Sequence, residues 1–180
     1  MCPVVVVRAR FGQDGGMPDQ DEVDRIVAAW GRQRDDLDFA PLQVLSRVDR
    51  LARHLDRARR AAFDASGTEP WEFDVLSALR RAGEPFELSP KTLLQQTLVS
   101  SGTMTNRVDR LTARGLVARR TDPKDGRGIL VSLTESGRAA VDSAIADLLR
   151  AERDILAGLS AGEQDQLAGL LRRLILGLGD

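Results

Sequence analysis

The apolar residues of this chain recur mostly at spacings of three and four, which is the period of an amphipathic helix. Acidic residues and prolines are typical of helix N-termini, so a first helix is predicted from Asp21, a second from Pro41 and a third after Pro70. The apolar stripe of the first helix comprises Val23, Ile26, Val27 and Trp30. The second helix is expected to bury Leu45, Val48, Leu51, Leu55, Ala58 and Ala62, and the third to carry Trp71, Val75, Leu76 and Leu79 on its apolar face.

Two short helices joined by a tight turn are predicted next. Ser89 precedes a proline and caps the first of them, and Ser100 or Ser101 caps the second, which ends at Gly115. The inward side of the second helix is expected to comprise Met104, Val108 and Leu111. A short helix, a turn and a second helix make up the helix-turn-helix motif.

Alternating apolar residues predict two strands, at residues 116–121 and 129–133, joined by a polar loop at 122–128. A long helix capped by Thr134 follows, and then a last helix that begins with the capping box of Ser160 and Glu163. The apolar stripe of the last helix is Leu167, Leu170, Leu171, Leu174 and Leu178.

The predicted fold class is mainly α with a small β-hairpin wing, a winged helix-turn-helix with N- and C-terminal dimerisation helices. We expect a flexible arm at residues 1–20 and N-terminal helices at 21–65, which serve dimerisation and a ligand pocket. The winged helix-turn-helix is expected at 66–134 and the C-terminal dimerisation helices at 135–180. The long apolar stripes of the first and last helices exceed what a lone winged-helix core needs, and they favour a homodimer.

Composition narrows the function. Hydrophobic residues make up 42% and charged residues 29%, as in folded proteins, and the formal net charge is −1. Cys2 and His54 are the only residues of their types, which excludes a disulfide or a thiolate metal cluster within one chain. No apolar run reaches the ~18 residues of a membrane span. We expect a cytoplasmic protein that needs no cofactor and contacts no membrane.

The helix predicted after Ser100 carries small hydrogen-bonding side chains where a recognition helix meets DNA. A helical wheel places Gly102 outward, where it allows close approach, and Asn106 is an amide of the kind that reads adenine. Serine and threonine hydroxyls reach bases or phosphates. The predicted DNA-contacting residues of this segment are Ser100, Ser101, Thr103, Thr105, Asn106 and Arg110.

Local charge agrees with a DNA-binding surface. Residues 99–128 contain seven basic and three acidic side chains, a net of +4, whereas residues 134–180 contain five basic and eight acidic ones, a net of −3. Lys124 and Arg127 lie in the loop between the strands, and an arginine at the tip of a hairpin can enter the minor groove of DNA. We expect both to contact DNA.

Each of these features has a simpler structural interpretation. Ser/Thr-rich helix starts are common caps, basic helix faces are usually only solvated, and His54 is expected to be a plain surface or interface residue. The alternative function is a winged-helix module that binds protein rather than DNA. It predicts that the exposed side of the helix after Ser100 is apolar or acidic. An enzyme is disfavoured because the chain has no Gly-rich phosphate loop and no Ser/His/Asp set.

The run of residues 99–128 and the continuation at 131–137 resemble the recognition helix and wing of the MarR family of transcriptional regulators. The resemblance extends over about residues 42–178. It implies a homodimer, held by the N- and C-terminal helices, that binds a pseudo-palindromic double-stranded DNA operator, most often as a repressor.

The extra N-terminal helix with Trp30 resembles the PecS/HucR subgroup, whose members respond to urate or to other small anions, including organic acids. The subgroup's ligand-pocket positions match Trp30, Asp74, Arg107 and Arg119 here. The chain departs from the urate responders near Ala82, where they have asparagine. Arg107 also lies on the flank of the recognition helix, so an anion that replaced an acidic partner such as Asp74 could move that helix. A fixed ion pair without any switching role is the simpler interpretation.

Overall fold

The structure, a computed structural model, describes residues 20–123 and 128–179 of the 180-residue chain. Its contacts divide the chain into two compact units, Met1–Ala52 and Arg53–Asp180, and this division falls inside a helix. The predicted flexible arm, with Cys2, lies outside the described residues except for Gln20. None of the described helices is long and apolar enough to cross a membrane.

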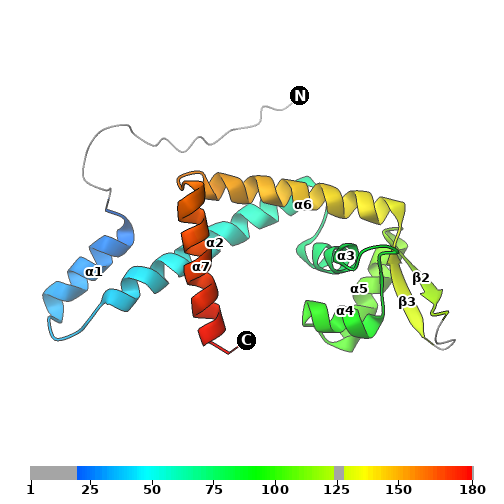
Figure 1. The fold of residues 1–180 in the computed structure, drawn as a ribbon, viewed down its shortest axis with the longest axis horizontal. Coiled ribbons are helices and arrows are strands. Elements are labelled where there is room, and N and C mark those ends of the chain that lie inside the picture. The colour runs from blue at the N-terminus through cyan, green and yellow to red at the C-terminus, as the bar shows by residue number, and fades with distance from the viewer. Residues whose placement is uncertain (1–19, 124–127, 180) are drawn as a thin grey trace, which may run out of the picture. The chain divides into compact units, whose positions relative to one another are not determined.

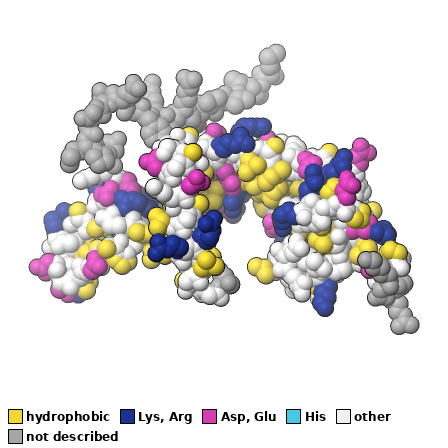
Figure 2. Space-filling model, viewed as in Figure 1, with side chains coloured by type: hydrophobic (Ala, Val, Ile, Leu, Met, Phe, Trp, Pro, Cys, Tyr) yellow, Lys and Arg dark blue, Asp and Glu magenta, His cyan; other side chains and the backbone are white. Residues whose placement is uncertain are grey.

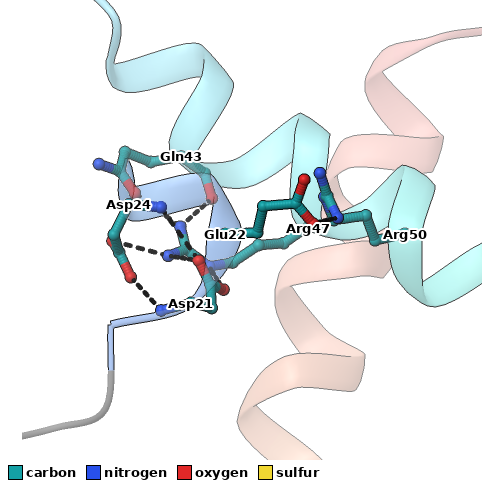
Figure 3. Close-up of polar contacts among 6 residues, drawn as sticks. All are labelled: Asp21, Glu22, Asp24, Gln43, Arg47 and Arg50. Carbon is teal, nitrogen blue, oxygen red and sulfur yellow. Dashed lines mark hydrogen bonds and ion pairs between the residues drawn. The ribbon is translucent and has the colours of Figure 1, made fainter. Parts of the chain in front are cut away.

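The first unit contains α1 (Glu22–Gln33) and the start of α2 (Ala40–Ala65). Asp21 caps α1 by accepting a hydrogen bond from the Asp24 amide at 3.0 Å, and Arg47 of α2 contacts both carboxylates at 2.8 Å (Figure 3). Arg50 similarly pairs with Glu22 at 2.6 Å. Exposed ion pairs are individually weak, so it is the shared network, together with the buried Val23, that fixes α1 on α2.

The second unit contains the winged helix. Its helices are α3 (Pro70–Arg81), α4 (Pro90–Thr97) and α5 (Ser101–Ala113), which pack together beside α6 (Glu135–Leu156), as Figure 1 shows. Their apolar stripes meet in one core, and this confirms the predicted inward residues of α3 and α5. The buried members of that core are Val75, Leu76, Ala78, Leu79, Leu93, Met104, Val108, Leu111, Val117, Val131 and Val141.

A three-stranded antiparallel sheet completes this unit. The predicted hairpin is present as β2 (Val117–Thr121) and β3 (Ile129–Leu133), in a register that pairs Arg119 with Val131. The sequence did not predict β1 (Glu87–Leu88), which pairs with the other edge of β3 to give the order β1-β3-β2. Two residues are too few to produce a periodic pattern.

The start of α6 is joined to the residues that follow α5. Thr134 caps α6 by accepting a hydrogen bond from the Gly137 amide at 2.9 Å, and its hydroxyl donates to the Gly115 carbonyl oxygen at 2.7 Å. A Cβ on Gly137 would lie 1.9 Å from the Leu116 carbonyl oxygen. The expected cap is therefore confirmed, and the glycine is required because the backbone of Leu116 occupies the space of a side chain.

One prediction about burial is wrong. Leu45, Val48 and Leu51 of α2 are 59%, 40% and 40% exposed in the single chain, and burial in this helix begins only at Ala62 and Phe63. The spacing identified an apolar stripe but could not show what covers it. The last helix, α7 (Ala161–Gly177), begins at the predicted capping box and has no buried residue along its length.

We predict that Gly137→Ala destabilises the protein by about 1–3 kcal/mol, the usual cost of forcing extra atoms into packed structure. Gly31→Ala is the matched control, because nothing lies within 4 Å of a Cβ at that helical position. There alanine is expected to be neutral or to stabilise by up to about 1 kcal/mol. Urea denaturation of both variants measures the difference, and equal stability of the two would contradict the assignment of Gly137.

Candidate nucleic-acid interface

The orientation of α5 follows from its cap and its buried stripe. Ser100 has an extended backbone, and its hydroxyl accepts a hydrogen bond from the Thr103 amide at 3.3 Å. Gly115 adopts a left-handed φ of +68° just after the helix, which favours glycine. Because Met104, Val108 and Leu111 are at most 2% exposed, the remaining faces of α5 are turned away from the core.

All six residues predicted to contact DNA from α5 and its cap are exposed: Ser100, Ser101, Thr103, Thr105, Asn106 and Arg110. Three of these hydroxyls also have internal partners. The Ser100 hydroxyl lies 2.9 Å from that of Thr103, and Thr105 donates to the Ser101 carbonyl oxygen at 3.1 Å. Gly102 is exposed as well, with open space around its Cα. The helix thus presents small polar groups and one amide along a continuous surface.

The wing extends this surface only in part within the described residues, because Lys124 and Arg127 lie outside them. The strands beside the loop carry arginines with acidic partners. Arg119 of β2 pairs with Asp109 of α5 at 2.6 Å, and Arg120 pairs with Glu87 of β1. These contacts neutralise part of the local positive charge, and the first fastens β2 to α5 while the second joins β2 to β1.

Arg107 acts on Asp74 through its charge, although no ion pair or hydrogen bond joins the two side chains among the described residues. Burial raises the pKa of the Asp74 carboxyl above its ordinary value, although Arg107 and Arg81 oppose this by favouring the charged form. The half-buried Arg107 has a terminal nitrogen, Nη1, that is buried and has no hydrogen-bond partner among the described residues. A buried cationic donor without an acceptor is a chemical fit for an anion.

The other two predicted ligand residues, Arg119 and Trp30, have contacts of their own. Arg119 is paired with Asp109 and is 38% exposed. Trp30 belongs to the first unit, where its ring stacks on Phe39 at a centroid distance of 6.2 Å and lines an open hollow with Ile26, Ala29 and Gln33. Trp30 is 51% exposed in the single chain.

Sequence reasoning missed the contacts between the first turn of α3 and the arginines of α5. Arg110 lies over the Trp71 ring at 4.5 Å from its centroid and 3.9 Å from Glu69, and Arg107 approaches the same ring at 5.8 Å. Glu72, only 1% exposed, pairs with Arg114 and accepts a hydrogen bond from the Glu69 amide at 3.0 Å. The spacing of the three arginines, at three and four residues, is the signal that places them on one flank of α5.

Known proteins resemble the chain in sequence and structure. A family model described as MarR family matches residues 66–128. The regulator PecS of Dickeya dadantii is 34% identical over 85% of this chain and 92% of its own length. The chain belongs to the MarR family of transcriptional regulators.

Two further MarR-family similarities bear on function. The transcriptional repressor NicR of Pseudomonas putida is 34% identical over 77% of this chain and 89% of its own length. The solved structure of BpsR from Bordetella bronchiseptica, described as regulated in DNA binding by 6-hydroxynicotinic acid, is 29% identical. It covers 77% of this chain and 96% of its own, with a TM-score of 0.60. These relatives are regulators rather than enzymes, and the described residues contain no group of three potential metal ligands.

Leu98 is a second feature of this MarR-family site that the sequence did not reveal. It forms the turn between α4 and α5 with a left-handed φ of 52° and is 91% exposed. Left-handed backbone is uncommon for residues other than glycine, and it costs a leucine more than it costs a glycine. The predicted tight turn is present, but the pattern of apolar residues gives no information about φ.

Proposed function

We propose that the chain binds operator DNA through the exposed face of α5, with the β2–β3 wing, including Lys124 and Arg127, contacting the duplex alongside. The observation that carries this proposal is the division of α5 into a buried apolar stripe and an exposed face of hydroxyls, an amide and Arg110. That face offers hydrogen-bonding groups for base edges and phosphates. The family's regulatory role supports the same use, with repression as the proposed outcome, as the name of NicR states for that relative.

The proposed DNA-binding form is a homodimer. One recognition helix spans too few base pairs to select a genomic site, and two copies on a pseudo-palindrome supply the rest. The exposed apolar side chains of α7 support this: Leu170, Leu174, Ile175 and Leu176 are each more than half exposed in the single chain. Figure 2 shows hydrophobic side chains on the visible face of that helix. A surface of this kind is typical of an interface.

The proposed effector is a small organic anion held by Arg107, with Asp74 as a further ligand residue. The unpartnered Nη1 of Arg107 supplies a buried cationic donor for this anion. Because 6-hydroxynicotinic acid regulates DNA binding by BpsR, 6-hydroxynicotinate is the first compound to test, with urate as the comparison.

We predict that Asn106→Ala weakens sequence-specific binding by about 1–3 kcal/mol, the usual value of a bidentate amide–base contact. The operator is first defined by selection from a random duplex pool and by footprinting the intergenic DNA beside the chain's own gene. Anisotropy titrations then compare operator with scrambled duplex. Binding to the scrambled duplex should change little. Gln20→Ala, which removes an exposed amide outside the helices, is the control. An unaltered operator preference in Asn106→Ala would remove the amide from the interface.

We predict that Leu174→Glu converts the dimer into a monomer, since it would place charges in an apolar interface. Sedimentation velocity measures the oligomeric state, and operator affinity should fall by about 10²-fold or more with the loss of paired binding. Ile129→Glu changes an equally exposed residue on β3 and should leave the oligomeric state unchanged. A wild-type chain that sediments as a monomer at micromolar concentration would exclude this interface.

We predict that Arg107→Gln raises the concentration of 6-hydroxynicotinate needed for operator release by about tenfold or more, because a hydrogen bond to a charged group is worth about 1.5–3 kcal/mol. Each variant is compared with its own effector-free affinity. Arg80→Gln is the matched control, as that arginine pairs with Asp142 at 2.8 Å. If neither 6-hydroxynicotinate nor urate releases the wild-type protein from the operator, both are excluded as effectors. If release is equal in both variants, Arg107 is not a ligand residue.

A further inference from the structure

The Trp71 ring is contacted by two cations that have different proposed roles. Arg107 and Arg110 are three residues apart on α5, so they lie on the same flank of the helix, and both guanidinium groups approach the ring, at 5.8 and 4.5 Å from its centroid. A ring within about 6 Å of a cation attracts it through its quadrupole. Two cations that share one ring also repel each other. The position of one therefore affects the other.

The two arginines face different surroundings. The Arg110 side chain is 56% exposed and belongs to the face proposed to contact DNA. Arg107 is half-buried, with Nη1 sealed from solvent. The ring thus lies between the surface that would meet phosphates and the buried donor that would meet an anion.

The ring itself is held in place. Pro70 opens α3 just before it, and Trp71 donates from Nε1 to a Glu69 carboxylate oxygen at 3.2 Å. The other Glu69 oxygen lies 3.9 Å from Arg110. Trp71 also packs against the buried core of the winged helix. A fixed ring passes on a change at one arginine to the other, because it cannot simply turn away.

We propose that Trp71 is a positioning residue that couples Arg107 to Arg110. This inference rests on the proposed DNA-binding and effector sites. When an anion draws Arg107 away from the ring, the ring and Glu69 hold Arg110 more firmly. Arg110 is then withdrawn from the phosphates, and operator affinity falls. Arg107→Gln removes the same cation without any effector, so it should reproduce part of this loss.

The test is a double-mutant cycle on operator affinity without effector. In the wild-type background Arg107→Gln should weaken binding by about fivefold, the lower end of usual coupling between sites. In a Trp71→Leu background the same change should have less than about a twofold effect, whereas independent residues would be additive and would show the same fivefold loss in both backgrounds. Trp71→Phe keeps an aromatic face and should restore the coupling. Phe73→Leu removes a neighbouring α3 ring that contacts Phe63 instead, and there the full effect should persist.

A direct measurement covers the case in which Trp71→Leu does not fold. Trp30→Phe leaves Trp71 as the sole tryptophan, and its emission should shift on operator titration with the same midpoint as anisotropy. The shift should be absent when Arg110→Ala is added and tested at saturating duplex. The coupling is overturned if Arg107→Gln lowers operator affinity equally in the wild-type and Trp71→Leu backgrounds. It is also overturned if the Trp71 emission does not change when the operator is added. A wild-type chain that binds no duplex would instead overturn the proposed function itself.

Discussion

The burial of one side of α5 is the constraint on which the rest of the site depends. Met104, Val108 and Leu111 fill the core shared by α3, β2 and β3, and a helix can turn only one face inward. Fixing that face leaves Asn106 and the neighbouring hydroxyls outside. The cap at Ser100 and the left-handed Gly115 then set where the helix begins and ends. The binding surface is therefore a consequence of apolar packing rather than of the polar residues themselves.

Ion pairs further fix the elements that apolar packing has positioned. Several basic groups that give the 99–128 segment its net positive charge are bound to acids from other elements: Arg114 to Glu72, Arg119 to Asp109 and Arg120 to Glu87. The first two pairs fasten α5 to α3 and to β2, and the third joins β2 to β1. All three reduce the charge that reaches solvent. The segment's formal charge thus overstates the field at the surface. The same charges do structural work before any DNA is present.

Much of the fold could be predicted from the sequence, because the residues that begin each helix are close to one another in the chain. Ser89, Ser100, Thr134 and Ser160 each cap a helix through a hydrogen bond to a backbone amide three residues on, and such spacing can be read directly from the chain. The exposed face of α5 followed from the same periodicity. The two-residue β1 and the left-handed Leu98 have no periodic signature, so neither was predicted.

Contacts between distant residues could not be predicted in the same way. Glu72 and Arg114 are 42 positions apart, and nothing local distinguishes their pairing from other acid–base combinations. A link between Asp74 and Arg107 was expected from the position of Arg107 on the helix flank and from a family resemblance, and the described residues show an electrostatic effect of Arg107 on the Asp74 carboxyl but no ion pair between them. The pairing of Arg119 with Asp109 was not expected at all. Local spacing determines which residues share a helix face, and tertiary packing decides which of them become neighbours.

The apolar stripes of α2 and α7 are not buried within a single chain. Leu45 and Leu174 recur at helical spacing as regularly as the buried residues of α3, yet they are 59% and 52% exposed. Apolar surface of this extent is unfavourable in water, and its regular spacing indicates that the helices are built to be covered. The winged helix, by contrast, closes its own core within one chain. The two parts of the sequence therefore encode different levels of organisation: a domain that folds within one chain, and helices whose apolar faces require a further surface.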